Sequence, residues 1–417
     1  MTHRTVFFPL MLGCVVIACG NGSESSTTST AGASGAGGSG GTADASFDQG
    51  APGGAGGESD AAGETGVSED ASDATSSRDA GLRGACSPPI DLDQPAPKLS
   101  LTGCVDPMDP TRLADVVVPY EVNSPLWSDS ADKTRAFVLP AGKKIRVKDC
   151  ALSPADCNGS ADDGKWVFPT GTVMIKNFIF DGKFVETRLF IRANDTTWIG
   201  YGYEWDEAQT DATVVGFDRV SVMFDTGQRT VSWHYPSRMD CMTCHNEAAG
   251  WTLGPETAQM NRIVAGTNQI DRFQSLGLFE VAPAKPYKAA LVTPYPGQLG
   301  APPVGATLEQ RARSYLHANC GFCHRPGGVL GTFDLRYDVP LKDTMTCDVA
   351  VTKSATGIDP LETKLLRPGD LGRSAISIRM GQADPDLGRM PQIGSYAVDG
   401  NAVTVVDDWI RSLQACP

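Results

Sequence analysis

The pattern of hydrophobic and polar positions changes twice along the chain, near residues 85 and 236. Between these points, short runs rich in Val, Ile, Phe, Tyr and Thr are separated by Gly, Asp, Asn and Pro. This pattern is typical of β-strands joined by turns. We predict strands at residues 134–139, 144–147, 172–180, 184–192, 198–205, 212–217 and 230–235. Asp181-Gly182 predicts a hairpin turn, because both residues tolerate positive φ. Many short strands at even spacing favour a β-sandwich or barrel-like domain over residues 86–236.

After residue 236 the apolar positions recur at helical spacing. Leu308, Ala312 and Leu316 predict a helix that leads into Cys320, and Val406 and Ile410 predict a terminal amphipathic helix. We therefore divide this part into a first segment, 237–300, and a second segment, 301–417, both mainly α. The expected fold class is α+β multidomain.

The first 85 residues have a different composition. Residues 1–18 resemble a secretory signal, with Arg4 before an apolar stretch that is too short to span a bilayer. The residues that lead to Cys19 resemble a bacterial lipoprotein cleavage box, which implies acylation of Cys19. We expect a lipid anchor in the cell envelope, in the periplasm or at the outer membrane. An ordinary signal peptide with an incidental cysteine is the alternative. Residues 19–85 are rich in Gly, Ser and Ala and predict a disordered tether.

The formal net charge of −14 changes this picture little. Much of it falls in the tether, whose acidic residues outnumber its arginines, Arg78 and Arg83. The rest of the chain is mildly acidic, which excludes the basic patch typical of nucleic-acid binding. A basic partner protein is compatible with this charge, but the charge does not require one.

Two copies of one pentapeptide carry the candidate chemistry. Cys241-Met242-Thr243-Cys244-His245 and Cys320-Gly321-Phe322-Cys323-His324 both match C-x-x-C-H, the signature of c-type haem attachment. Two thiols at this spacing add to the two vinyl groups of a porphyrin, and the adjacent histidine binds the iron. We therefore expect two covalently attached haems c. A redox dithiol would not require the histidines, and a zinc site built from the four thiols is the other alternative.

Six other cysteines fit an oxidising compartment. They are Cys86, Cys104, Cys150, Cys157, Cys347 and Cys416. We expect disulfides among them, with the pairs nearest in sequence, Cys86–Cys104 and Cys150–Cys157, as the first choice, which leaves Cys347–Cys416. Sequence alone does not choose among the fifteen possible connectivities.

The axial ligands follow from the motifs and their surroundings. His245 and His324 are the expected proximal ligands, and Met390, just before the terminal helix, is the expected distal ligand of the second haem. For the first haem, Met260 and His317 are the favoured distal ligands. His234 is a third option for this position. An open sixth position on the first iron is the alternative.

The part of the chain beyond the tether resembles a group of bacterial di-haem c-type cytochromes with a β-rich N-terminal region. The resemblance is carried by residues 119–129, 168–173, 203–212, 236–238, 312–328 and 367–370, and by Met390-Pro391. Gln392 stands where many such cytochromes have a second proline. The resemblance implies haem binding and electron transfer, and it implies no substrate.

These observations favour an anchored electron carrier that works between redox partner proteins. A haem enzyme of the di-haem peroxidase type is the first alternative, and it requires an acid or base beside an open iron, for which Glu247 and Glu256 are near in sequence. The electron-accepting subunit of a periplasmic dehydrogenase is the second alternative. Coordination of the first iron separates the carrier from the enzyme.

Overall fold

The computed structural model describes residues 86–89, 91, 94–151, 153–157, 164–218, 220–295, 305–352 and 355–417. The expected signal sequence, Cys19 and the tether lie outside the described residues. All described residues belong to one unit, Glu69–Pro417. Within this part of the chain, no helix has both the length and the apolar character needed to cross a bilayer.

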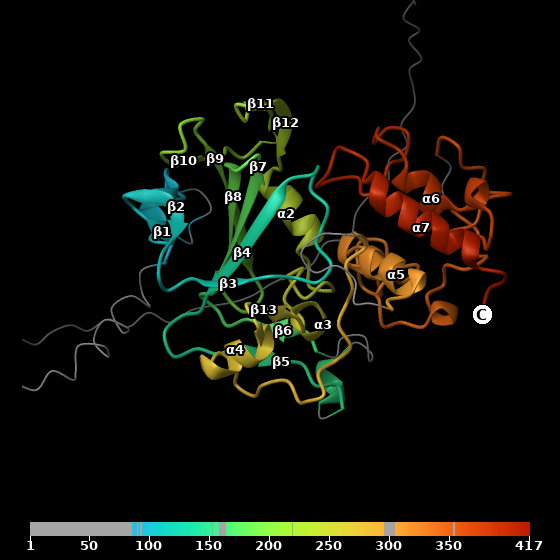
Figure 1. The fold of residues 1–417 in the computed structure, drawn as a ribbon, viewed down its shortest axis with the longest axis horizontal. Coiled ribbons are helices and arrows are strands. Elements are labelled where there is room, and N and C mark those ends of the chain that lie inside the picture. The colour runs from blue at the N-terminus through green and yellow to red at the C-terminus, as the bar shows by residue number, and fades with distance from the viewer. Residues whose placement is uncertain are drawn as a thin grey trace, which may run out of the picture. The chain divides into compact units, whose positions relative to one another are not determined.

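A six-stranded antiparallel sheet lies at the centre of the β-rich region (Figure 1). Its strand order is β10-β9-β8-β7-β4-β3. The strands are β3 (Val118–Tyr120), β4 (Asp132–Val138), β7 (Val173–Phe180), β8 (Lys183–Arg192), β9 (Trp198–Trp205) and β10 (Ala212–Val214). Asp181 and Gly182, with φ of 51° and 82°, form the predicted turn between β7 and β8. Positive φ at both positions matches the twist of the flanking strands.

The remaining strands form two-stranded sheets. They are β1 (Val105–Asp106) with β2 (Asp109–Leu113), β5 (Arg146–Val147) with β6 (Trp166–Val167), β11 (Val220–Asp225) with β12 (Thr230–Tyr235), and β13 (Ile263–Val264) with β14 (Thr267–Asn268). The prediction of a β-rich region is confirmed. The large sheet is open, with β10 and β3 as its edges, so the described strands form neither a closed barrel nor a sandwich of two large sheets. Strand spacing alone does not show how strands are shared between sheets.

Side chains on the large sheet alternate between two faces. Ala136, Ile175, Leu189 and Tyr201 are paired in register across β4, β7, β8 and β9 and are buried on one face. This face packs in one core with the segment around Leu99 near the start of the described chain. The opposite face is therefore left for other contacts.

The helices are short and are separated by long irregular segments. The α-helices are α2 (Arg238–Cys244), α3 (Thr257–Met260), α4 (Gln269–Ser275), α5 (Leu308–Asn319), α6 (Ala375–Met380) and α7 (Gly400–Ser412). Turns of 3-10 helix occur at η1 (Leu99–Thr102), η2 (Pro154–Asp156), η4 (Leu341–Asp343) and η5 (Leu371–Arg373). The two predicted helices correspond to α5 and α7. The expectation that residues 237–417 are mainly α was too strong, because Gly- and Pro-containing turns interrupt the segment.

Helices α5 and α7 share one hydrophobic core (orange and red in Figure 1). Ala312 and Leu316 of α5 are buried in it with Val406, Trp409 and Ile410 of α7. Burial of each large apolar side chain contributes about 1.5–3 kcal/mol. Since α5 ends one residue before Cys320, this core fixes the position of the second motif.

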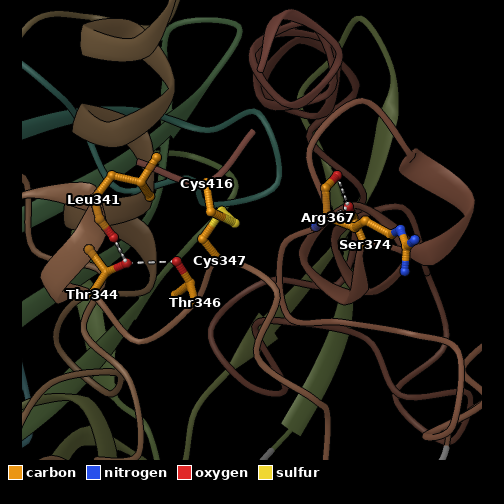
Figure 2. The surroundings of a disulfide bond; sticks show 7 residues. All are labelled: Leu341, Thr344, Thr346, Cys347, Arg367, Ser374 and Cys416. Atoms are coloured by element: carbon orange, nitrogen blue, oxygen red, sulfur yellow. Dashed lines mark hydrogen bonds between the residues drawn. A yellow bond between two sulfur atoms is a disulfide. The ribbon is translucent and has the colours of Figure 1, made fainter. Parts of the chain in front are cut away.

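Three disulfides are present, and they match the pairs that the sequence suggested. They join Cys86 to Cys104, Cys150 to Cys157 and Cys347 to Cys416. The last one spans 69 residues and ties the end of the chain next to the hydrogen-bonded turn around Thr344 and Thr346 (Figure 2). A crosslink over a long loop restricts the unfolded chain most. The four cysteines of the two motifs are free thiols.

Candidate functional site

Helix α2 presents the first motif. Ser237 caps its start, because the Ser237 hydroxyl accepts from the Asp240 N–H at 3.2 Å and the Asp240 carboxylate accepts from the Ser237 N–H at 2.9 Å. This capping box is readable in Ser237-Arg-Met-Asp. Cys241 and Cys244 lie three residues apart and therefore on one side of the helix. The His245 N–H donates to the Cys241 carbonyl at 2.9 Å, which closes the helix at the motif.

Helix α5 presents the second motif in a similar way. Thr307 and Gln310 form its capping box, and the helix ends at Asn319. The His324 N–H donates to the Cys320 carbonyl at 2.9 Å, the same bond that joins the equivalent residues of the first motif. Burial raises the pKa of the Cys320 thiol to about 12. The two motifs thus share this hydrogen bond, although Cys241–Cys244 are helical and the second motif lies in turns beyond the end of α5.

The two motifs lie against each other. Cys323 Sγ lies 4.0 Å from the Thr243 carbonyl oxygen, and the neighbouring Cys323 thiol, with burial, raises the pKa of Cys244. Asn246 Nδ2 also donates to the Phe322 carbonyl at 3.4 Å. Among the described residues, no group of three or more His, Cys, Asp or Glu is placed to hold a metal ion. The thiols therefore lack the tetrahedral arrangement of a structural zinc site.

The open face of the large sheet supports the first motif. A Cβ on Gly200 of β9 would lie 2.9 Å from Cys241 Sγ, so the helix can approach the strand only because this residue is glycine. Phe190 of β8 is paired with Gly200, and its ring lies 4.2 Å from the His245 ring. The backbone at Gly200 and the ring of Phe190 therefore form the surface on which the first motif packs.

A large cavity adjoins Cys241, Cys244 and His245. Its space, counted out to the open mouth and including open solvent there, is about 1430 Å³. Its walls come from β4, β7, β8, β9, α2 and residues 252–255. The cavity therefore offers room for a large planar cofactor beside both thiols.

The imidazole of His245 is oriented for metal binding. Its Nδ1 lies 2.6 Å from the Trp251 carbonyl oxygen. A carbonyl only accepts, so Nδ1 carries the proton and Nε2 keeps its lone pair. Burial lowers the pKa of His245 to about 4, against the opposing effect of Trp251, so the ring is neutral at pH 7. A second hydrogen bond of this kind is usual for metal-bound histidines.

The second motif adjoins a smaller cavity of about 350 Å³. Cys320, Met380 and Met390 line it together, so the structure brings Met390 next to the second motif. Met380 also belongs to the core between α5 and α7. His324 is buried, its ring stacks 4.3 Å from the ring of Phe333, and burial lowers its pKa to about 4.

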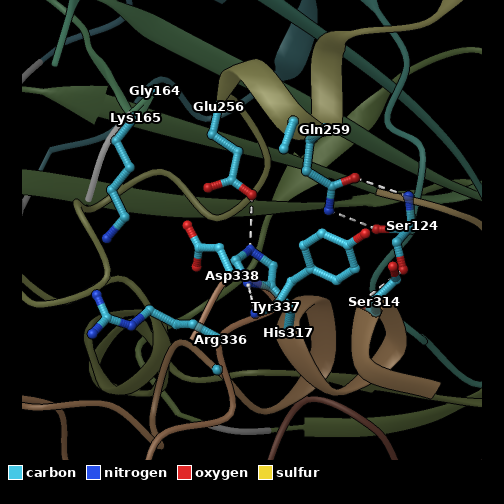
Figure 3. A network of polar contacts seen from close by, with 12 residues as sticks. Ser124, Gly164, Lys165, Glu256, Gln259, Ser314, His317, Arg336, Tyr337 and Asp338 are labelled. Atoms are coloured by element: carbon cyan, nitrogen blue, oxygen red, sulfur yellow. Dashed lines mark hydrogen bonds and ion pairs between the residues drawn. The ribbon is translucent and has the colours of Figure 1, made fainter. Parts of the chain in front are cut away.

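The favoured sixth ligands of the first haem are engaged elsewhere. Met260 is fully buried in a core, where its Sδ accepts from Gln269 Nε2 at 3.2 Å. His317 Nε2 lies 2.7 Å from the Glu256 carboxylate, and its Nδ1 accepts from the Tyr337 N–H at 3.0 Å (Figure 3). Both ring nitrogens are thus bound by protein groups, and neither side chain lines the large cavity.

Two other side chains complete the comparison with the sequence. His234 of β12 contacts the Ser221 hydroxyl, and its ring lies 4.0 Å from that of Tyr396, away from the large cavity. Met174 of β7, which the sequence did not suggest, does line the cavity. Gly200 was also missed, although glycine inside a strand pattern signals a close approach.

The donor set therefore fits c-type haem: two thiols and one neutral imidazole at each motif, with a thioether beside the second. Comparisons of the chain with protein-family models, with curated proteins and with solved structures found no match.

We predict that Gly200→Ala displaces α2, because the new Cβ would overlap Cys241 Sγ. Crowding of this kind costs about 1–3 kcal/mol. Thiol labelling of the haem-free protein should then modify Cys241 faster than in the wild type. Gly216→Ala is the matched control, since an added Cβ there meets no atom within 4 Å. Equal labelling rates in the two variants would contradict the close contact.

We also predict an acid-sensitive contribution from Glu256. Burial opposes its ionisation, but His317 and Lys165 outweigh burial and lower the pKa from 4.5 to about 2. A carboxyl with a depressed pKa stabilises the fold above its unfolded pKa, and this stability is lost as the pH falls towards the folded value. Glu256→Gln should lose about 3 kcal/mol at pH 7, and its difference from wild type should narrow from pH 4.5 downwards. Denaturant unfolding at several pH values checks this, with exposed Glu280→Gln as the control. A difference independent of pH would refute the pair's role.

Proposed function

We propose that the protein is a di-haem c-type cytochrome, anchored as a lipoprotein, that carries electrons in the cell envelope. The observation that supports this proposal is the contact between the two C-x-x-C-H segments, where Cys323 Sγ lies 4.0 Å from the Thr243 carbonyl oxygen and Asn246 Nδ2 donates to the Phe322 carbonyl. Electron tunnelling slows steeply with distance, so adjoining attachment sites suit transfer between two centres. The chain would relay electrons between redox partner proteins.

Each motif has the groups that haem attachment requires. Cys241 with Cys244, and Cys320 with Cys323, would form the thioethers, while His245 and His324 would be the proximal ligands. Bound haem supplies a reversible one-electron couple at iron. The Trp251 carbonyl holds His245 in the tautomer that binds metal. Phe190 packs against the His245 ring and shares a core with Met242 of the motif.

The second segment suits a small cytochrome c-like unit. A helix leads into the motif, a terminal helix packs on it, and Met390 shares a cavity with Cys320. The thioether of Met390 is a soft donor that favours Fe(II) and raises the potential. These features support Met390 as the distal ligand of the second haem.

A haem enzyme of the di-haem peroxidase type is the second candidate. The observation in its favour is that Met260 and His317 are both held by other protein groups. If Met174 does not take their place, the first iron keeps an open position. Glu256, the acid expected near such an iron, is paired with His317 and lines a different, smaller cavity.

We predict two covalent haems when the chain is produced with a cytochrome c maturation system. A haem-stained denaturing gel and reduced-minus-oxidised spectra provide the measurement. Cys241→Ala/Cys244→Ala should keep one haem, and Cys320→Ala/Cys323→Ala should keep the other. Spectra insensitive to carbon monoxide support the carrier, whereas a carbon monoxide complex that persists in the second variant favours the enzyme. Absence of haem stain in the wild-type protein would exclude both the electron carrier and the haem enzyme.

For the second haem, we predict that Met390→Ala lowers the midpoint potential of one haem and alters its reduced spectrum, because a soft ligand to Fe(II) is lost. Spectroelectrochemical titration measures both. Exposed Met345→Ala is the matched control and should leave both haems unchanged. If Met390→Ala behaves like the control, another group holds the sixth position.

A further inference from the structure

Three cationic side chains form a row on the open face of the large sheet. Arg135 of β4 is paired directly with Lys176 of β7, and Lys176 is paired directly with Arg188 of β8. Residues in register on neighbouring strands project from the same face. All three line the large cavity that also contains Cys241 and His245.

Such a row is costly with protein groups alone. Like charges directly opposite each other destabilise a sheet, and these three side chains are half-buried, which reduces their screening by water. Burial is the main cause of a lowered pKa at Arg135 and at Lys176, and Arg135 depresses Lys176 further. The buried Nη2 of Arg135 has no hydrogen-bond acceptor among the described residues. Lys176 Nζ lies over the Phe178 ring, 4.8 Å from the ring centre.

The nearest carboxylate is already used. Glu186 is fully buried and accepts from Arg188 Nε and Nη2 at 2.8 and 2.7 Å, and it also accepts from Trp233 Nε1. This paired geometry compensates Arg188, whereas Glu186 acts on Lys176 only from a distance and makes no ion pair with Arg135 or Lys176.

The charges of the whole cavity lining lead to the same result. Its cations are Arg135, Lys176, Arg188 and Arg238, and its carboxylates are Glu186 and Asp240. The lining therefore has two positive charges in excess. A ligand with two carboxylates would neutralise them.

We propose that Arg135 and Lys176 bind two carboxylates, and that these are the propionates of the haem attached at Cys241 and Cys244. This inference rests on the proposed function. In this arrangement the row of cations would orient the haem. The thioethers would fix one edge of the haem, and Arg135 and Lys176 would fix its propionates. It also explains why a sheet retains three cations in register.

The test is a comparison of Lys176→Met in two backgrounds. Without attachment at the first motif, in Cys241→Ala/Cys244→Ala, loss of the cation relieves repulsion, so the melting temperature rises. In the haem-loaded protein the same change leaves a propionate unpaired, so the melting temperature falls. The midpoint potential of the first haem also falls, because removing a positive charge favours Fe(III). Arg135→Met should show the same reversal, and Lys183→Met, at the turn end of β8, should change neither quantity.

The outcomes separate the sources of the carboxylates. The propionate assignment is supported if Lys176→Met lowers the potential of the first haem and shifts the melting temperature in opposite directions in the two backgrounds. Melting shifts of the same sign in both backgrounds overturn it. Succinate is the probe for a free dicarboxylate. If succinate raises the melting temperature of the haem-loaded protein saturably, and Lys176→Met abolishes this effect, the row binds a free acid and the assignment is wrong.

Failure of the proposed function is distinguishable from failure of this inference. If the wild type takes up no haem, the gel shows it, and the propionate assignment falls with it. The succinate titration then decides whether Arg135 and Lys176 still form a carboxylate site. Saturable succinate binding that requires Lys176 would show that Arg135 and Lys176 form a carboxylate site without haem. If succinate does not bind saturably, the two residues form no such site.

Discussion

The approach of α2 to the bare backbone of β9 is the contact on which the candidate site depends. At Gly200 the strand has no side chain, and Cys241 occupies the space where one would project. This contact fixes the first motif on the sheet. Since Cys244 then contacts Cys323, it also relates the first motif to the second, which α5 and α7 hold from the other side. A change at one glycine therefore acts on both motifs.

The two faces of the large sheet have different tasks. One face is apolar, packs under the first described segment and is closed by the Cys86–Cys104 disulfide. Its burial provides the hydrophobic stabilisation that the strands need. The other face is thereby free to carry glycine, aromatic rings and the cationic row. Three like charges in register reduce the stability of a sheet, whereas Phe137, Phe190 and Trp198 on the same face are buried in a second core that stabilises it.

Much of the fold was predictable because local patterns determine it. Short-range periodicity and turn preferences predict strand β9 (Trp198–Trp205), the Asp181-Gly182 turn and the helix before Cys320. Proximity along the chain suggested the disulfide pairs but did not select them among the fifteen possible connectivities. The division of the strands between the large sheet and the two-stranded sheets was not predictable, because it depends on long-range packing.

For the candidate site, the motif residues were predictable and their environment was not. C-x-x-C-H is a local signature, whereas the Cys244–Cys323 contact joins residues far apart in the sequence. Met260 and His317 were reasonable ligands by distance along the chain. In the fold, Gln269 and Glu256 hold them. The register of Arg135 with Lys176 and Arg188 follows only from strand pairing, so the sequence shows three unrelated basic residues.

The proposed role in electron transfer would place a further constraint on these contacts. Charge at iron changes by one unit in each step, so surroundings that are already oriented reduce the rearrangement that accompanies transfer. The Trp251 carbonyl on His245 and the Glu186 carboxylate on Arg188 are fixed within the fold, the first by a tight turn and the second by a sheet. An enzyme that binds a substrate at iron needs, in addition, an open position and a proton donor beside it. Glu256, the expected donor, is instead committed to His317, and this difference favours the carrier.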